Sequence, residues 1–299
     1  ANSEKGGKTA KFKVVDELKT KYPVVKICEK LQISKSGYYK YLKTKGKKKK
    51  ESKKDQQLKE CISLIFHEHK GRYGYRKIHA VLNNQYQLPV SEKVVRRLMR
   101  ELGLKCQSRM KRKQPVKVKK ATSAGYIYEN LLKRNFSTTR LNEKWVTDVT
   151  EIAVEDKKLF VSAVMDLHNN EIIGHQISST HDVQLVEDSL LYALEIRHIK
   201  DSLILHSDQG MPYRSTRWKT LMDTFSITPS MSRKANALDN ACIESFFSYL
   251  KTEMEQDLRR TKSVEEATQL IHDYIRYYNH QRIQGVLRYQ TPTQYAKAS

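Results

Sequence analysis

Three acidic residues occupy places where a globular core seldom holds a carboxylate without a partner. Asp148 lies inside the strand-like run WVTDVTEI, and Asp208 ends the short apolar run LILHSD, where an α/β sheet presents its ligand-binding loops. Glu244 follows in SRKANALDNACIESFF, in which Asp239 and Asn240 are suited to cap a helix. Aspartate is disfavoured inside strands and is almost never buried alone. We therefore expect a cation beside Asp148.

Carboxylates from two strands and a facing helix supply the oxygen ligands that Mg²⁺ or Mn²⁺ prefers, and substrate phosphates supply others. Two such ions about 3.5–4 Å apart can stabilise the attacking and the leaving oxygen of an in-line displacement at phosphorus. The chain contains no Walker loop, no GxSxG elbow and no HExxH helix. The three acids therefore predict cleavage or transfer of a phosphodiester. The alternative for Glu244 is an ordinary solvated residue, because a lone glutamate on an amphipathic helix usually faces solvent.

Neighbouring polar residues have second interpretations. Asp166, in AVMDLHN, has a similar strand context but is better explained as a polar anchor for the turn HNN. His206 shares a strand face with Asp208 and is either a packed core residue or a hydrogen-bonding residue of the site. A zinc site is disfavoured because no cysteine pair has ligand spacing with the nearby histidines His67, His69 and His79.

The positive charge is concentrated in the first part of the chain. The 299 residues carry a net charge of +23, and residues 1–120 hold 35 Lys and Arg against 10 Asp and Glu. Residues 121–299 are nearly neutral, with 21 against 23. A lysine-rich soluble surface would explain the charge alone, but the basic residues are interleaved with helical apolar patterns. We expect a polyanion-binding region, because each neutralised phosphate releases a counterion.

Composition also bounds the class of protein. The chain is 38% hydrophobic, which is enough for a sizeable core, and no apolar run approaches the roughly 18 residues of a membrane span. The start, ANSEKGGKTA, lacks a signal-type stretch. The four cysteines are scattered without a CxxC pair and predict reduced thiols. We expect a cytoplasmic protein that associates with the nucleoid and has no membrane partner.

Four regions follow from the pattern. Residues 1–50 are expected to form a basic helix-turn-helix module and linker, with Ser34 or Ser36 capping its second helix. Residues 51–109 predict a second helix-turn-helix-like domain, whose third helix is expected to be capped by Ser91. Residues 110–138 are a basic linker, and residues 139–299 form the domain that carries the acids.

The region 139–299 predicts an α/β fold. Strand-like runs at 144–155, 158–169 and 171–178 form an antiparallel meander. A helix at 183–198, a strand at 202–208, a helix at 217–225 and a strand at 227–232 follow, and helices complete the chain. This order describes a mixed sheet with helices on both faces, preceded by all-α helix-turn-helix modules.

At this point the motifs match a known family. WVTDVTEI, HSDQG followed by Tyr213, and ALDNACIESFFSYLKTE, with 35 residues between Asp208 and Glu244, closely resemble the DDE transposases of the insertion-sequence-three family. The likeness is to the product of its second reading frame. GRYGYRKI, LPVSEKVVRRLMRELGL and YYNHQRIQGVLRYQTPTQY resemble flanking segments of that family, so the resemblance extends from about Tyr22 to the end.

The resemblance implies a ribonuclease-H-like, retroviral-integrase-like catalytic core. In it Asp148, Asp208 and Glu244 coordinate two Mg²⁺, which Mn²⁺ can replace, and Asp148 bridges them. Water frees a 3′-OH at an element end, and this hydroxyl attacks another DNA strand, first joining one end of the element to the other. Lys251 approaches the DNA end, and Asn240, one turn before Glu244, orients the site.

The implied partners are double-stranded DNA, as terminal inverted repeats and target, a homodimer or larger synaptic complex, and an upstream first-reading-frame partner or fusion. Three alternative classes fit the sequence less well. A retroviral integrase would carry an HxxxH and CxxC zinc module, which is absent here. A DNA-binding regulator would tolerate loss of an acid, whereas all three acids are present, and a ribonuclease H would not need two helix-turn-helix units. The residues expected to bind DNA are Lys251, Asn240, Arg72, Arg76, Lys93, Arg96, Arg97, Arg100, Lys111, Arg112 and Lys113.

Overall fold

The computed structural model describes residues 2–45, 52–106, 125–233 and 236–298. The chain divides into two compact units, Ala1–Gln57 and Leu58–Ser299, and each is described by itself. The expected boundary near residue 50 and the basic linker fall largely outside the described ranges. The division of the second unit at residues 109 and 138 stays a prediction.

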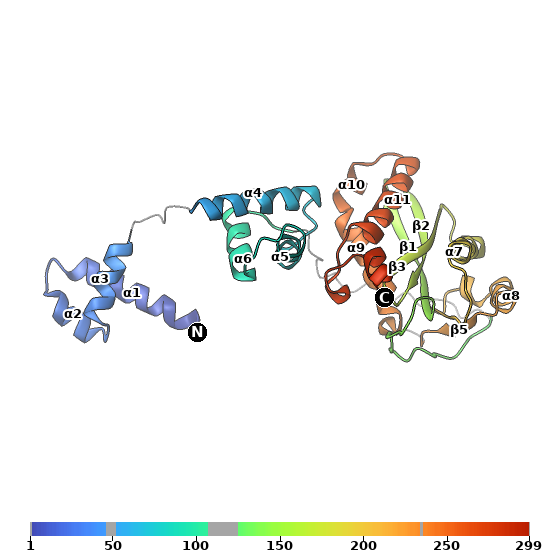
Figure 1. Cartoon of the computed structure of the whole chain (residues 1–299), viewed down its shortest axis with the longest axis horizontal. Coiled ribbons are helices and arrows are strands. Elements are labelled where there is room, and N and C mark those ends of the chain that lie inside the picture. Colours follow the sequence, from blue (N-terminus) through green and yellow to red (C-terminus); the bar gives the residue numbers. More distant parts are fainter. Residues whose placement is uncertain (1, 46–51, 107–124, 234–235, 299) are drawn as a thin grey trace. The chain divides into compact units, whose positions relative to one another are not determined.

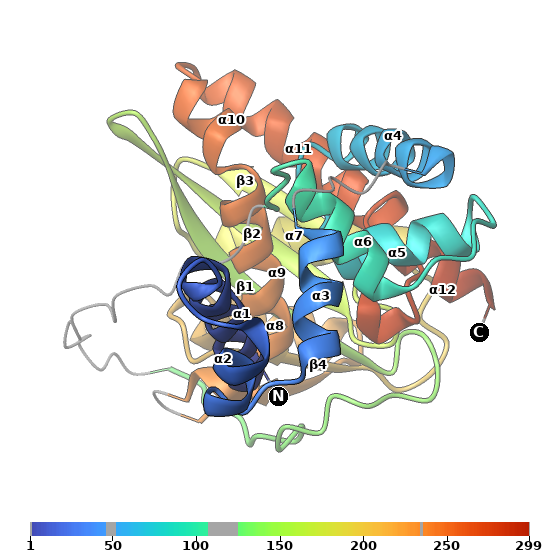
Figure 2. The ribbon, with the colours of Figure 1, turned by 90° about the vertical axis from the view of Figure 1, so that its left-hand side faces the viewer.

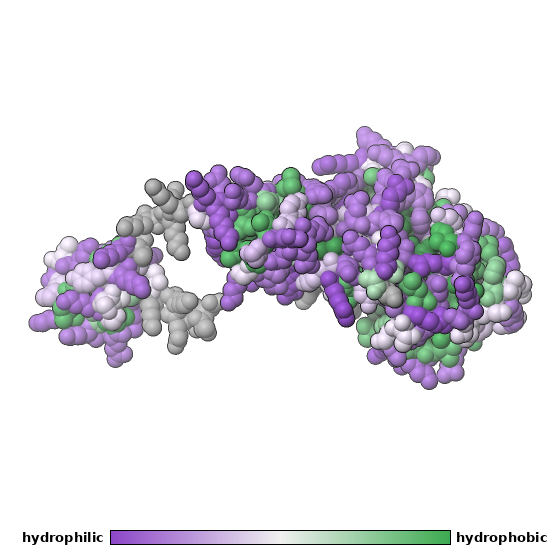
Figure 3. Space-filling view, in the orientation of Figure 1, coloured by the Kyte–Doolittle hydropathy of each residue, from purple (hydrophilic) through white to green (hydrophobic). Residues whose placement is uncertain are grey.

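The first unit consists of three helices (Figure 1): α1 (Asn2–Leu18), α2 (Val24–Lys30) and α3 (Lys35–Thr44). Its small core is built from Val15, Ile27, Cys28 and Tyr38. The side chain of Ser34 accepts a hydrogen bond from the backbone N–H of Gly37, so this serine caps α3. The helix, turn and helix expected within residues 1–50 are confirmed by α2 and α3. Hydrophilic side chains cover much of the face of this unit seen in Figure 3.

Three further helices precede the sheet: α4 (Lys53–Glu68), α5 (Tyr75–Asn84) and α6 (Glu92–Glu101). Ser91 stands at the N-cap position of α6, but its side chain makes no capping hydrogen bond. The expected cap is therefore wrong, although the helix begins where the serine predicts. The apolar faces of the helices meet in one core, which includes Leu58, Ile62, Ile65, Ile78, Val81, Leu82, Val95 and Leu98.

A five-stranded mixed sheet lies at the centre of the second unit, with the order β3-β2-β1-β4-β5. β1 and β2, and β2 and β3, pair antiparallel, which confirms the expected meander. β4 runs parallel to β1, and β5 runs parallel to β4. The strands are β1 (Lys144–Val154), β2 (Lys157–Asp166), β3 (Glu171–Ser178), β4 (Ile204–Ser207) and β5 (Thr228–Met231).

Helices cover both faces of the sheet and confirm the expected fold class. In Figure 1, α9, α10 and α11 lie on one side of the sheet and α7 and α8 on the other, and Figure 2 shows α9 over β1, with which it is in contact. The helices of this part are α7 (Val183–Ile196), α8 (Thr216–Thr224), α9 (Ala241–Glu253), α10 (Glu255–Arg260), α11 (Val264–His280) and α12 (Pro292–Ala298). Short 3-10 helices are η1 (Pro212–Arg214), η2 (Ala237–Asn240) and η3 (Gly285–Leu287).

Strand alternation decides which face each residue of β1 presents. Val146, Ile152 and Val154 belong to the core shared with α9 and α11, whereas Trp145 belongs to the core shared with α7 and α8. Asp148 has the parity of Val146 and so lies on the α9 face. On the other face, α7 approaches β3 so closely that a Cβ at Gly174 would clash with the carbonyl oxygen of Ser189. None of the helices in the described ranges is long and apolar enough to cross a membrane.

Candidate active site

Asp148 and Asp208 are brought level by the register of two neighbouring strands. Val146 of β1 pairs with His206 of the parallel strand β4. Asp148 lies two residues after Val146, and Asp208 lies two residues after His206, directly after β4 ends at Ser207. Because neighbouring strands lie about 4.8 Å apart, this register sets the two carboxylates side by side at the carboxyl end of β4.

Glu244 comes from the first turn of α9. Ile243, Phe246 and Phe247 of this helix are buried in the core with the sheet, whereas Glu244 is solvent-exposed. The side-chain amide of Asn240, just before the helix, donates to the carbonyl oxygen of Thr147 at 3.3 Å. Thr147 precedes Asp148, so the start of α9 is tied to β1 beside the first acid.

The three acids, Asp148, Asp208 and Glu244, act on one another electrostatically. Burial raises the pKa of Asp148 to about 8, the negative charges of Asp208 and Glu244 add to the rise, and Lys251 opposes it. Partial desolvation of its carboxylate, followed by the charge of Asp208, also raises the pKa of Glu244, although part of this side chain is in solvent. The site therefore carries an excess of negative charge, which a bound cation would relieve.

The donor set fits a divalent cation that takes further ligands from a substrate. Across the described ranges, no three His, Cys, Asp or Glu side chains converge closely enough to cage a metal ion by themselves. Mg²⁺ does not require such a cage, because it commonly binds one or two carboxylates and completes its shell with water and phosphate oxygens. Oδ1 of Asn240 is buried and has no hydrogen-bond partner in the described part of the chain, which leaves an oxygen acceptor at the start of α9.

The loop after β4 is held in place by contacts of its own. The backbone N–H of Gly210 donates to Oδ1 of Asp208 at 2.7 Å. Tyr213 is buried, its hydroxyl lies 3.3 Å from Oγ1 of Thr147, and its ring meets that of Trp218 edge-on at 5.1 Å. The bond from Gly210 fixes the direction of the Asp208 carboxylate, and the contacts of Tyr213 hold the loop that follows.

His206 is both a core residue and a hydrogen-bonding one. Its Nδ1 lies 2.8 Å from Oγ of Ser230 and its Nε2 lies 3.0 Å from Oγ of Ser232. Burial lowers the pKa of His206 to about 4, so the ring is neutral at pH 7. The histidine thus joins β4 to β5 directly behind Asp208.

Asp166 and the three N-terminal histidines have structural surroundings. The carboxylate of Asp166 is buried and accepts hydrogen bonds from the backbone N–H groups of Asn142 and His168, both at 2.9 Å. Its interpretation as a turn anchor is confirmed. His69 stacks on Tyr73 with ring centroids 3.8 Å apart. None of these histidines belongs to a metal-ligating group among the described residues.

The basic residues expected on DNA fall into several groups. On the helical domain, Arg76, Lys93, Arg96 and Arg100 are exposed, and Arg97 pairs with Glu101 at 2.9 Å. Lys251 is partly buried, and its positive charge acts to lower the pKa of Asp148. Asn240 is buried and hydrogen-bonded to Thr147. Three of the expected residues lie outside the described ranges: Lys111, Arg112 and Lys113.

Arg72 requires a correction. Its side chain is only 7% exposed and lies 3.9 Å from the carboxylate of Asp257. The guanidinium also faces the rings of Tyr274 and Tyr277, at 5.4 and 4.6 Å from their centroids. Because the cation is held inside the second unit, it is not offered to DNA in this structure.

A cluster around Asp239 is not predicted by the sequence pattern. The expected helix cap by Asp239 and Asn240 is wrong, because neither makes a side-chain capping hydrogen bond to α9. Asp239 is instead fully buried and ion-paired with Arg134 and Arg233. The only local signal was the presence of Arg233 six residues before Asp239.

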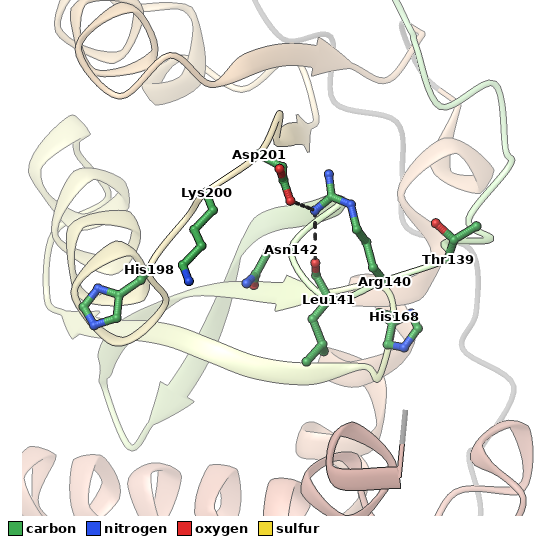
Figure 4. Close-up of a pocket in the computed structure, with 8 residues that line it drawn as sticks. All are labelled: Thr139, Arg140, Leu141, Asn142, His168, His198, Lys200 and Asp201. Atoms are coloured by element: carbon green, nitrogen blue, oxygen red, sulfur yellow. Dashed lines mark hydrogen bonds and ion pairs between the residues drawn. The ribbon is translucent and has the colours of Figure 1, made fainter.

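A separate pocket lies at the opposite end of the strands (Figure 4). It has a volume of about 300 Å³, and none of the three acids lines it. Within it, Arg140 is ion-paired with Asp201 at 3.2 Å. Its lining residues precede β1 and β4 or follow β2: Thr139, Arg140, Leu141, Asn142, His168, His198, Lys200 and Asp201.

Comparison with known proteins agrees with this arrangement. Residues 53–113 match the HTH-like domain family, and residues 138–237 and 244–299 match integrase core domain families. The chain is 38% identical over 284 residues to the transposase InsK of insertion sequence element IS150 from Escherichia coli K12, covering 95% of this chain and 97% of that protein. It is 29% identical to the transposase InsF of insertion sequence IS3A from the same organism, covering 81% and 83%.

Among solved structures, the HTLV-2 integrase catalytic core domain in complex with magnesium matches 52% of this chain and 97% of that chain, at 14% identity and a TM-score of 0.43. The matched domains, the length of the alignment with InsK and the likeness to InsF lead to one assignment. The chain belongs to the insertion-sequence-three (IS3) family of transposases, which join an HTH-like domain to an integrase core.

Proposed function

We propose that the chain binds the terminal inverted repeats of an insertion sequence and cuts and joins DNA strands with Mg²⁺ held by the three acids. Family membership supports DNA transposition and integrase-like transfer of DNA strands. The observation that carries the finer proposal is the level placement of Asp148 and Asp208, with Glu244 close enough to raise the pKa of Asp148.

Each group has a task in this proposal. Bound Mg²⁺ ions would polarise the phosphodiester and stabilise charge on its attacking and leaving oxygens. Asp148, Asp208 and Glu244 would hold these ions. Asn240 keeps α9 against β1 through Thr147, and Lys251 places a positive charge where the DNA end approaches.

The same site would serve two successive transfers. The nucleophile is water in the cleavage step and the freed 3′-OH in the joining step, and in each step one P–O bond forms as another breaks. The neutral His206 and the buried Tyr213 hold β4 and its loop in position.

DNA recognition falls to the helical parts in this proposal. Lys93, Arg96 and Arg100 line the exposed side of α6, opposite its buried Val95 and Leu98, as suits a helix placed in a DNA groove. Target DNA, a dimeric or larger synaptic assembly, and an upstream first-reading-frame partner complete the proposed reaction.

The test uses a labelled duplex that carries the terminal repeats of the encoding element. We expect Mg²⁺-dependent nicking or strand joining by the wild-type chain, none in EDTA, and partial activity with Mn²⁺. Asp148→Asn and Glu244→Gln should abolish the products and keep DNA binding. A duplex that is bound but stays uncut with either metal, even after addition of the upstream-frame protein, would contradict the proposal and favour a regulator.

A further inference from the structure

A buried aspartate holds two arginines side by side next to the candidate active site. Asp239 is 0% exposed, and Oδ2 accepts from both the backbone N–H and Nε of Arg233, at 3.1 and 2.9 Å. Oδ1 accepts from Nη2 of Arg233 and Nε of Arg134, both at 3.0 Å. Asn130 donates a further hydrogen bond to Oδ2 at 2.9 Å.

This cluster adjoins the elements that carry the three acids. The backbone N–H of Ser232, the residue before Arg233, donates to the carbonyl oxygen of Ser207, the residue before Asp208, at 2.8 Å. At the other end of the cluster, Asp239 is followed by Asn240, which is bonded to Thr147 next to Asp148. Both arginines are therefore anchored within a few residues of the proposed metal ligands.

The arginines present more donors than the aspartate uses. Their side chains remain 59% (Arg233) and 45% (Arg134) exposed, although the carboxylate between them is fully buried. Arg134 uses Nη2 on Oδ1 of Asn236 at 3.1 Å. Within the described ranges, Nη1 of neither arginine has a hydrogen-bond partner.

One arginine is enough to neutralise a buried acid, as a second site in the same unit illustrates. Glu187 on α7 is buried and, among the residues that the structure describes, pairs with one cation, Arg217 of α8, whose side chain is 62% exposed. At Asp239 the second arginine leaves a net positive charge. Charge neutralisation alone does not account for it.

Resting on the proposed function, we propose that Arg134 and Arg233 form a phosphate clamp that receives a DNA backbone phosphate beside the three acids. The guanidinium fork suits bidentate contact with phosphate oxygens, and arginine sheds its hydration more readily than lysine. Asp239 fixes both forks in advance, which reduces the conformational entropy lost when DNA binds.

The test measures the affinity of the full chain for the labelled terminal-repeat duplex in EDTA, over a series of salt concentrations. Arg134→Gln and Arg233→Gln should each weaken binding about 3–10-fold and lower the magnitude of the salt slope by about 0.9, the value for one phosphate contact. Arg233→Lys keeps the charge, so it should keep the slope and still bind less tightly. Asp239→Asn should likewise keep the slope and weaken binding.

The matched control is Arg217→Gln, which also removes an exposed arginine from a buried acid and should leave affinity and slope unchanged. Thermal unfolding identifies the variants that remain folded. Wild-type slope and affinity in folded Arg134→Gln and Arg233→Gln would overturn the clamp, even if the wild type cuts DNA. Failure of the wild type to bind the duplex would instead overturn the proposed function.

Discussion

Arg282 and Glu253 form an ion pair that is almost completely removed from solvent. Nε of Arg282 lies 3.1 Å from both carboxylate oxygens and Nη2 lies 2.7 Å from one, while the side chains are 5% and 4% exposed. The hydroxyl of Tyr274 donates to the same carboxylate at 3.0 Å. The pair joins α9 to the segment after α11, so it supports the helix that carries Glu244.

Glu253→Gln should lower the free energy of unfolding by about 3–5 kcal/mol, because it leaves a buried guanidinium without its counter-charge. Urea unfolding measures this cost. The control is Glu255→Gln, which breaks the exposed pair with Arg259 and should cost less than about 1 kcal/mol. Equal costs for the two substitutions would show that the buried pair does not stabilise the unit.

Lys77 should make the free energy of unfolding depend on pH in the neutral to alkaline range. Its Nζ is buried without a hydrogen-bond partner in the described part of the chain and lies 4.8 Å from the centroid of the Tyr73 ring. Burial, followed by the charge of Arg282, lowers the pKa of Lys77 from 10.5 to about 7. Between these values the unfolded chain binds the proton and the folded chain does not, so the free energy of unfolding rises with pH.

Lys77→Met removes this dependence. We expect the substitution to raise the free energy of unfolding by about 2–4 kcal/mol at pH 7 and by less than about 1 kcal/mol at pH 10, where the pH is close to the pKa of the unfolded lysine. The measurement is urea unfolding at both values, with the exposed Lys93→Met as control. A gain of the same size at pH 7 and pH 10 would show that lysine ionisation is not the cause.

Mg²⁺ should stabilise the chain through the three acids even without DNA. Their mutual repulsion is relieved by a bound cation, and a ligand that binds only the folded state raises the unfolding temperature. We expect excess Mg²⁺ to raise that temperature by roughly a few degrees and EDTA to reverse the rise. Asp208→Asn should abolish the shift, whereas Asp201→Asn, in the separate pocket, should keep it. An equal shift in both variants would place the bound metal elsewhere.

Much of the fold follows from local pattern. The alternation in β1, β2 and β3 predicts the meander, and an aspartate in the middle of WVTDVTEI already indicates an unusual site. The ends of the elements are predicted less well than their type: the strand expected at 202–208 is shorter in the structure, where β4 is Ile204–Ser207. Short buried strands begin and end where pairing with neighbours permits, and their own sequence does not specify that.

The contacts that local pattern cannot predict join residues far apart in the chain. The pairing of Val146 with His206 aligns two acids that are 60 positions apart, and Arg134 reaches Asp239 from 105 residues away. Arg72 lies in a basic segment typical of DNA contact, yet it packs on tyrosines some 200 residues later. Sequence periodicity reports which side of an element is apolar, and it does not report which distant group a cation meets.

Metal rescue at Asp208 tests the central claim most directly. A cysteine thiolate is a softer ligand than a carboxylate and suits Mn²⁺ better than Mg²⁺. We predict that Asp208→Cys loses DNA nicking in Mg²⁺ and recovers part of it in Mn²⁺, while Asp208→Ala stays inactive in both. Wild-type activity of Asp208→Cys in Mg²⁺, or equal recovery of the alanine variant in Mn²⁺, would contradict a metal-binding role for this acid.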